Sequence, residues 1–154
     1  MKIAVVGTGY VGLVTGTCFA ETGNDVVCVD IDERKVASMK AGNIPIYEPH
    51  LDVLFERNIK AGRLSFTTSL AEAIEDATLI FLALPTPPGE DGSADLSYVL
   101  GVADDLGKMI KDYKVIIDKS TVPVGTAEKV HEAVAANATV DFDVVSNPEF
   151  LREG

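Results

Sequence analysis

The sequence predicts an α/β protein whose doubly wound, mainly parallel sheet carries helices on both faces. Short apolar, β-branched segments alternate with helical segments along the whole chain, and right-handed crossovers between parallel strands place such helices on both faces. The first strand also runs directly into a glycine-rich turn. A length of 154 residues, 47% of them hydrophobic, suits one compact domain. These observations together favour a Rossmann-type fold.

The opening thirty residues carry the strongest signal. Lys2 to Val6 is a short apolar run that is typical of a strand buried on both faces. It leads into Gly7-Thr8-Gly9-Tyr10-Val11-Gly12, and residues 11–22 then show a helical pattern that Gly23 ends. A second apolar strand over residues 26–30 ends in Asp30. This order of strand, glycine turn, helix, strand and acid is typical of a dinucleotide site.

Each part of this unit has a chemical reason. Gly7 permits the tight turn, Gly9 lets the backbone approach a pyrophosphate, and Gly12 lets the helix lie close to the sheet. The phosphates would bind free N–H groups at the start of the helix. The Asp30 carboxylate would accept hydrogen bonds from both ribose hydroxyls and repel a 2′-phosphate, so we expect NAD rather than NADP.

The remaining elements follow in order along the chain. Helices are expected over residues 33–41, 51–60, 70–75, 95–110 and 126–136, and strands over 64–67, 78–84, 115–118 and 142–146. The strand over 78–84 is the most apolar, which predicts a central position, and Pro85 to Pro88 end it. Ligands bind at the carboxyl ends of such strands, so the loops there should meet in one crevice.

Each candidate in those loops also has a purely structural interpretation. Pro85 to Pro88 could be only a rigid turn, and Ser120 and Thr121 could cap the helix that follows. Glu149 and Glu153 could belong to a solvated helix face of an acidic protein. Arg34 and Lys35 could be a helix-surface pair or could leave a small opening for NADP. These alternatives stay open at the level of composition and spacing.

Charge and cysteine content exclude several classes of function. A formal net charge of −11 argues against a nucleic-acid or anionic-membrane partner. No apolar run approaches the roughly 20 residues of a membrane span, so we expect a cytoplasmic protein. Cys18 and Cys28 fit neither a metal spacing nor a disulfide framework, and both are expected to be buried as small hydrophobes. We therefore expect no metal site.

Six motifs carry a resemblance to a known family. G-T-G-Y-V-G, V-D-I-D, I-P-I-Y-E-P, P-T-P, K-S-T-V-P-V-G-T and S-N-P-E-F-L-R-E-G occur in this order. Over all 154 residues the chain resembles the amino-terminal, NAD-binding domain of the UDP-glucose 6-dehydrogenases. Their wider family includes GDP-mannose and UDP-N-acetylmannosamine dehydrogenases, and the choice among the three sugar nucleotides stays open.

The resemblance implies an enzyme that oxidises UDP-glucose to UDP-glucuronate with two NAD and water, through a cysteine thioester. Thr121 and Glu149 match the family residues that act on the water of thioester hydrolysis. The cofactor residues expected from the glycine turn, the acid and the resemblance are Gly7, Thr8, Gly9, Tyr10, Val11, Gly12, Asp30, Lys35, Leu84, Thr86, Ser120, Thr121 and Glu153. The residues expected at the substrate are Glu149, Phe150, Leu151 and Arg152.

The resemblance also bears on the extent of the chain. The family's nucleophilic cysteine, catalytic lysine and asparagine, central dimerisation helix and nucleotide-sugar domain would all lie beyond residue 154. Residues 1–154 are thus expected to be an NAD-binding domain that is inactive alone and belongs to a homo-oligomeric enzyme.

Two rival classes remain. A dehydrogenase of the 6-phosphogluconate or hydroxyisobutyrate kind is disfavoured by the S-T-V-P and N-P-E-F-L motifs. A nucleotide-sensing regulatory module would not need Thr121 and Glu149 in one crevice.

Overall fold

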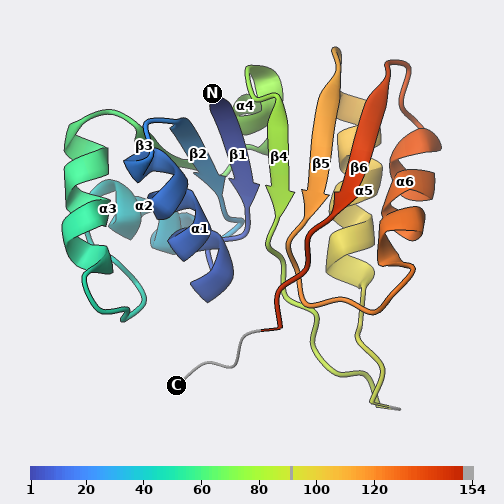
Figure 1. Ribbon diagram of the computed structural model, residues 1–154, viewed down its shortest axis with the longest axis horizontal. Coiled ribbons are helices and arrows are strands. Elements are labelled where there is room, and N and C mark those ends of the chain that lie inside the picture. The colour runs from blue at the N-terminus through green and yellow to red at the C-terminus, as the bar shows by residue number, and fades with distance from the viewer. Residues whose placement is uncertain (91, 151–154) are drawn as a thin grey trace.

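A computed structural model describes residues 1–90 and 92–150, which form one six-stranded sheet flanked by helices (Figure 1). The strand order is β3-β2-β1-β4-β5-β6, and all five pairings of these strands are parallel. The strands are β1 (Lys2–Val6), β2 (Asp25–Val29), β3 (Leu64–Thr67), β4 (Leu79–Leu82), β5 (Lys114–Asp118) and β6 (Phe142–Ser146). The chain switches direction across the sheet between β1 and β4, which confirms the doubly wound prediction.

The helices cover both faces of this sheet. They are α1 (Tyr10–Glu21), α2 (Glu33–Lys40), α3 (Leu51–Lys60), α4 (Leu70–Glu75), α5 (Ser97–Met109) and α6 (Thr126–Ala135). In Figure 1, α1 lies in front of the β1–β3 half and α3 flanks it, whereas α5 lies behind the β4–β6 half and α6 lies beside it. None of the described helices is long and apolar enough to cross a membrane.

Alternation along the strands divides the core into two layers. In β1, Ala4 and Val6 belong to the core layer that includes residues of α4, α5 and α6, while Ile3 and Val5 belong to the layer that includes residues of α1, α2 and α3. All four side chains are at most 5% exposed. The apolar run at the start of the chain therefore forms a strand buried on both faces, as predicted.

Two boundaries differ from the prediction by two residues and the others by at most one, and hydrogen bonds explain the two larger differences. β4 ends at Leu82 rather than residue 84 because the Leu84 N–H donates to Ser120 Oγ at 3.0 Å instead of continuing the ladder. α5 begins at Ser97 rather than residue 95 because Asp95 lies before the helix, where its side chain accepts the Ser97 N–H at 2.9 Å.

The two cysteines differ, and the prediction that both are buried is wrong for one of them. Cys28 on β2 is fully buried, and burial raises the pKa of its thiol to about 12. Cys18 is exposed because α1 turns Leu13, Gly16 and Ala20 toward the core and leaves Cys18 on the solvent side. Among the described residues, no group of histidine, cysteine or acidic side chains could hold a metal ion.

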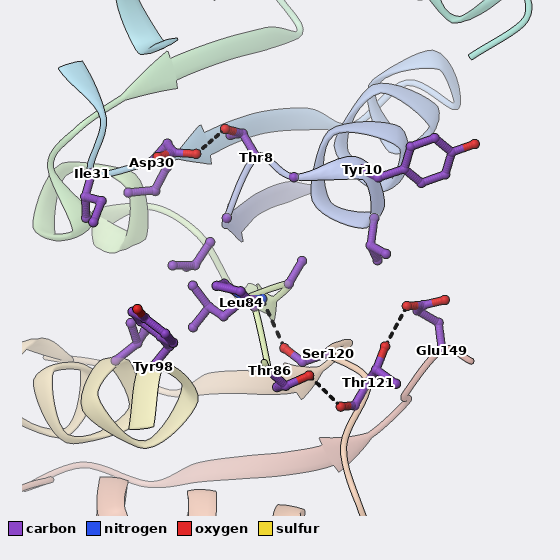
Figure 2. A pocket seen from close by; sticks show the side chains of 18 of the residues that line it. Thr8, Tyr10, Asp30, Ile31, Leu84, Thr86, Tyr98, Ser120, Thr121 and Glu149 are labelled. Atoms are coloured by element: carbon purple, nitrogen blue, oxygen red, sulfur yellow. Dashed lines mark hydrogen bonds between the residues drawn. The ribbon is translucent and has the colours of Figure 1, made fainter. Parts of the chain in front are cut away.

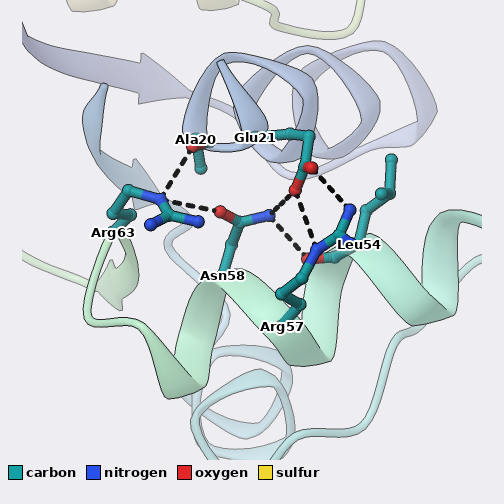
Figure 3. A network of polar contacts seen from close by, with 6 residues as sticks. All are labelled: Ala20, Glu21, Leu54, Arg57, Asn58 and Arg63. Atoms are coloured by element: carbon teal, nitrogen blue, oxygen red, sulfur yellow. Dashed lines mark hydrogen bonds and ion pairs between the residues drawn. The ribbon is translucent and has the colours of Figure 1, made fainter. Parts of the chain in front are cut away.

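A polar network fixes α3 against α1 at the amino end of the sheet (Figure 3). The fully buried Asn58 donates to Glu21 Oε2 and to the Leu54 carbonyl, each at 2.8 Å. Arg63 donates to the Ala20 carbonyl at 3.1 Å and to Asn58 Oδ1 at 3.0 Å, and Arg57 forms an ion pair with Glu21. These bonds satisfy the buried amide of Asn58. They also hold the carboxyl end of α1 away from the carboxyl ends of the strands, where ligands bind in such folds.

Candidate functional site

A cavity of about 630 Å³ lies at the carboxyl ends of β1, β2, β4 and β5 (Figure 2). It brings together most of the residues selected from the sequence: Gly7, Thr8, Gly9, Tyr10, Val11, Asp30, Lys35, Leu84, Thr86, Ser120, Thr121 and Glu149. The predicted convergence of the loops is therefore present in the structure.

Five of the residues selected from the sequence do not line the cavity. Gly12 lies behind the turn, and the Phe150 side chain is 70% exposed and outside the lining. Leu151, Arg152 and Glu153 fall outside the described residues.

The three glycines of the turn meet different surroundings. Gly7 has φ +104°, and a Cβ there would lie 2.1 Å from the Ala83 carbonyl oxygen. A Cβ on Gly12 would lie 2.0 Å from the Gly7 carbonyl oxygen, so the fold itself requires glycine at both positions. A Cβ on Gly9 would meet no atom within 4 Å. Gly9 thus borders open space in the cavity, and this space fits the close backbone approach of a pyrophosphate.

Asp30 is held by three donors at the end of β2. The hydroxyl of the fully buried Thr8 donates a hydrogen bond to Asp30 Oδ2, and Lys35 Nζ donates to the same oxygen at 2.9 Å. The Asp32 N–H donates to Oδ1 at 3.1 Å. Burial acts to raise the pKa of Asp30, but these hydrogen bonds and the Lys35 charge outweigh it and hold the pKa below its ordinary value. Asp30 is therefore an oriented carboxylate, and Lys35 faces it.

The opposite wall is built by the loops after β4 and β5. Ser120 is 3% exposed, and its hydroxyl donates to the Leu82 carbonyl at 3.1 Å while accepting the Leu84 N–H. Thr86 Oγ1 donates to the Thr121 carbonyl at 2.8 Å. Ser120 and Thr86 thus tie the two loops to each other, in addition to bordering the cavity (Figure 2).

Thr121 and Glu149 meet at one end of this cavity. Thr121 Oγ1 donates to Glu149 Oε1 at 2.8 Å, and the pair is accessible to solvent. The segment that carries Glu149 is anchored on β5, because the Asn147 N–H donates to the Asp118 carbonyl at 2.9 Å. Lys119 Nζ also donates to Asn147 Oδ1 at 3.1 Å. A hydroxyl and a carboxylate joined in this way can hold and deprotonate a water molecule.

Sequence reasoning missed the apolar part of the lining. Val29, Ile31, Tyr98 and Val102 all border the cavity, and Figure 2 shows Ile31 and Tyr98 on the side away from Glu149. Ile31 could have been selected from the sequence, because it directly follows Asp30. There was no comparable reason in the sequence to select Tyr98, because the predicted start of its helix was two residues too early.

Comparisons with known proteins agree with this geometry. The family model described as "UDP-glucose/GDP-mannose dehydrogenase family, NAD binding domain" matches residues 1–154. UDP-glucose 6-dehydrogenase TuaD of Bacillus subtilis is 56% identical over 155 residues, which cover 99% of this chain and 34% of that protein. UDP-glucose 6-dehydrogenase of Pseudomonas aeruginosa is 50% identical, with coverages of 100% and 35%. The chain thus spans about a third of the length of the curated relatives it matches.

Solved structures show the same relationship. A UDP-glucose dehydrogenase from Pyrobaculum islandicum superposes with a TM-score of 0.93 at 45% identity, covering 99% of this chain and 36% of that one. A ternary complex of GDP-mannose dehydrogenase from Pseudomonas aeruginosa gives 0.89 at 35% identity, with coverages of 99% and 37%. The chain therefore belongs to the UDP-glucose/GDP-mannose dehydrogenase family and corresponds to its NAD-binding domain.

Proposed function

We propose that this chain is the cofactor-binding part of a UDP-glucose 6-dehydrogenase, an enzyme that converts UDP-glucose to UDP-glucuronate with two NAD and water. The observation that carries the proposal is the Thr121–Glu149 hydrogen bond at one end of a dinucleotide cavity. The choice of UDP-glucose is supported by 56% and 50% identity to two UDP-glucose 6-dehydrogenases. Solved GDP-mannose and UDP-N-acetylmannosamine dehydrogenases are 35% and 31% identical to this chain.

The cavity residues suit NAD, because the backbone at Gly9 borders open space and Asp30 is a hydrogen-bonded carboxylate. Bound NAD would supply the hydride acceptor for an alcohol. Asp30 would accept hydrogen bonds from the adenosine ribose, with Lys35 balancing its charge, and the open backbone at Gly9 would face the pyrophosphate. Thr86 and Ser120 would hold the opposite wall at a fixed distance from this turn.

Thr121 and Glu149 would act together on a water molecule. The Thr121 hydroxyl donates a hydrogen bond to Glu149 Oε1, so the lone pairs of its oxygen can accept a hydrogen bond from water. Glu149 can accept a second hydrogen bond from the same water and take up its proton when the oxygen attacks an acyl group. This pair would orient and activate the water; it would not form a covalent bond to the substrate.

The remaining functions are proposed for the part of the enzyme outside these 154 residues. That part would supply the cysteine nucleophile, the nucleotide-sugar pocket and the homo-oligomer contacts. Phe150, Leu151 and Arg152 would contribute to substrate binding, and Glu153 to cofactor binding. The relatives' greater length supports this division. We also propose a cytoplasmic enzyme without nucleic-acid or membrane partners, which the net charge of −11 supports.

A domain exchange tests the proposal. Residues 1–154 would replace the matching segment of the Bacillus subtilis enzyme, and NADH formation would be measured with UDP-glucose, GDP-mannose and UDP-N-acetylmannosamine. We expect two NADH per UDP-glucose and no NADH from that sugar with the 154-residue chain alone, which should still bind NAD in calorimetry. Steady turnover by the chain alone would contradict the assigned roles. A folded chimera that oxidises only another sugar nucleotide would contradict the choice of substrate.

A further inference from the structure

The segment that carries Glu149 leaves the sheet at its edge. β6 is the last strand in the order, so among the described strands it is bonded only to β5. The ladder extends one bond beyond β6, where the Asn147 N–H donates to the Asp118 carbonyl at 2.9 Å. Val145 and Asn147 are both exposed, so little packing holds this end of the strand. A segment with few buried contacts needs other attachments if its position is to be fixed.

The loop that carries Thr121 is, by contrast, bonded along its length to the end of β4 and the residues after it. The Lys119 N–H donates to the Leu82 carbonyl at 2.9 Å, and the Ser120 hydroxyl donates to the same carbonyl at 3.1 Å. The Thr121 carbonyl accepts the Thr86 hydroxyl at 2.8 Å. This loop is therefore a fixed support to which the segment after β6 can be attached.

The Lys119 side chain connects this support to the segment after β6. Lys119 is half-buried, and its Nζ donates to Asn147 Oδ1 at 3.1 Å. Asn147 is thus held twice, through its backbone N–H by Asp118 and through its side-chain oxygen by Lys119. A single hydrogen bond would leave Asn147 free to rotate about that bond, whereas two bonds on different atoms fix its orientation. The Lys119 donor is charged, which makes the second bond stronger than one between neutral groups.

Pro148 transmits the orientation of Asn147 to Glu149. The proline ring fixes its own φ, and the residue before a proline is restricted to extended backbone. Few torsions are therefore free between Asn147 and the carboxylate that accepts the Thr121 hydroxyl at 2.8 Å (Figure 2). Loss of either bond on Asn147 would allow Glu149 to move relative to Thr121. A displacement of about 1 Å near a reacting group can cost roughly a hundredfold in rate.

Resting on the proposed function, we propose that Lys119 is a positioning residue for the hydrolytic step. Through Asn147 it holds Glu149 within hydrogen-bond reach of Thr121, while Lys119 itself touches neither the water nor the substrate. In that step the oxygen of water bonds to the acyl carbon, a proton passes from the water to Glu149, and the C–S bond breaks with its electron pair on the thiolate. Lys119 therefore acts on hydrolysis and not on the two oxidations that precede it.

Rapid mixing of UDP-glucose and NAD with the Bacillus subtilis chimera tests the role in hydrolysis. NADH formed in the first turnover reports the oxidations, and the later steady rate includes hydrolysis. Lys119→Met should lower the steady rate roughly ten- to hundredfold and leave the first-turnover rate within about threefold. Lys119→Arg keeps a charged N–H donor and should restore the steady rate to within about threefold. Lys129→Met is the matched control, because Lys129 is exposed on α6 and does not line the cavity.

A double variant tests whether Lys119 acts through Asn147. Asn147→Ala should reproduce the effect of Lys119→Met, and the two changes together should give a steady rate within about threefold of either alone. Effects that multiply in the double variant would overturn the proposal. An unchanged steady rate in folded Lys119→Met would also overturn it, as would an equal loss of rate in the first turnover.

Hydrogen exchange in the 154-residue chain tests the attachment without any reaction. Lys119→Met should speed exchange of the Asn147 amide by roughly three- to tenfold, because the bond from this amide to Asp118 loses the support of the second bond. NAD affinity should stay within about threefold, and the midpoint of thermal unfolding within about 3 °C. Unchanged exchange would overturn the proposal. An unmodified chimera that oxidises no UDP-glucose would instead contradict the proposed function, and exchange would still decide whether Lys119 holds Asn147.

Discussion

The two ends of the cavity are built in different ways. At the Asp30 end, the buried Thr8 and the Lys35 ammonium converge on Asp30, and Gly7 and Gly12 lie in backbone contacts that admit no side chain. At the other end, Thr121 is hydrogen-bonded to Glu149 in contact with solvent. The fold therefore fixes the Asp30 end by packing, whereas substitution at the Glu149 end should leave the fold intact. Binding and chemistry should be separable by mutation.

The largest effect is expected at the turn. Gly9→Val should reduce NAD affinity by roughly a hundredfold or more, because the added side chain fills the space of the pyrophosphate while meeting no protein atom within 4 Å at its Cβ. Thermal unfolding should remain close to that of the unmodified chain. Gly12→Ala is the matched comparison, since its Cβ would overlap the Gly7 carbonyl and should destabilise the fold by about 1 to 3 kcal/mol. Unchanged NAD affinity in folded Gly9→Val would show that the turn does not face the cofactor.

A smaller effect is expected at Asp30. Asp30→Ala should narrow the preference for NAD over NADP by on the order of 1 to 3 kcal/mol, because a charged acceptor for ribose is lost and Lys35 is released to meet a 2′-phosphate. Titration with both cofactors measures the difference. Asp30→Ala combined with Lys35→Met should bind NADP more weakly than Asp30→Ala alone. Equal affinities for NAD and NADP in the unmodified chain would contradict the assigned role of Asp30.

Asp118 is a buried residue that supports the Glu149 end of the cavity, because its backbone carbonyl accepts the Asn147 N–H and its side chain accepts the Ser120 N–H. Asp118 is fully buried. Its Oδ1 accepts the Ser120 N–H at 3.2 Å, whereas its Oδ2 has no hydrogen-bond partner among the described residues. Burial raises the pKa of Asp118, partly offset by the Ser120 N–H, so the folded state holds this proton more tightly than the unfolded state. Its contribution to stability is therefore fully present below the ordinary pKa of an aspartate and is lost as the pH rises through the raised value.

Asp118→Asn removes this ionisation. The difference in the free energy of unfolding, variant minus unmodified chain, should be more positive at pH 7 than at pH 4. The unmodified chain loses the contribution of protonated Asp118 as the pH rises, whereas the variant has none to lose. Urea unfolding at the two pH values measures it. A difference that is constant or has the opposite sign would mean that Asp118 does not titrate as its burial indicates.

The smallest effect on the isolated chain is expected at the Glu149 end. Thr121→Val and Glu149→Gln should each change stability by no more than about 0.5 kcal/mol and NAD affinity by less than about threefold, because their hydrogen bond is accessible to water. In the chimera with the Bacillus subtilis enzyme, the same changes should slow NADH formation. Loss of NAD binding in either variant would show that the two ends are not separable.

Local patterns were sufficient to predict the fold. Alternating apolar runs and turn residues located all six strands, because a buried parallel strand needs a continuous apolar segment that few other structures share. The crevice also followed, since parallel strands bring their carboxyl ends to one edge. The positions of Gly7, Asp30, Thr86 and Thr121 on one cavity needed no knowledge of side-chain contacts.

The contacts between those loops could not be predicted. The attachment of Lys35 to Asp30 depends on how α2 leaves β2, and the structural use of Ser120 depends on a bond to Leu82 in a strand 38 residues earlier. Tyr98 borders the cavity from the first turn of α5, which starts at Ser97 rather than at the predicted residue 95. Exposed Cys18 shows the same limit, because α1 is apolar on more than one side and its sequence did not reveal which side faces the sheet.

The close approach of Gly7 to Ala83 also constrains how the protein is made. The Ala83 N–H donates to the Val6 carbonyl at 2.8 Å, so the surroundings of the turn are completed by the residue after β4, which emerges from the ribosome more than 70 residues after Gly7. Closing so long a loop is slow compared with forming α1, and nascent chains that end before Ala83 lack one wall of the turn. NAD binding by ribosome-bound chains of increasing length should therefore begin only after β4 has emerged. From that length on, bound NAD stabilises the folded sheet, because a ligand that binds only the folded state shifts the folding equilibrium toward it.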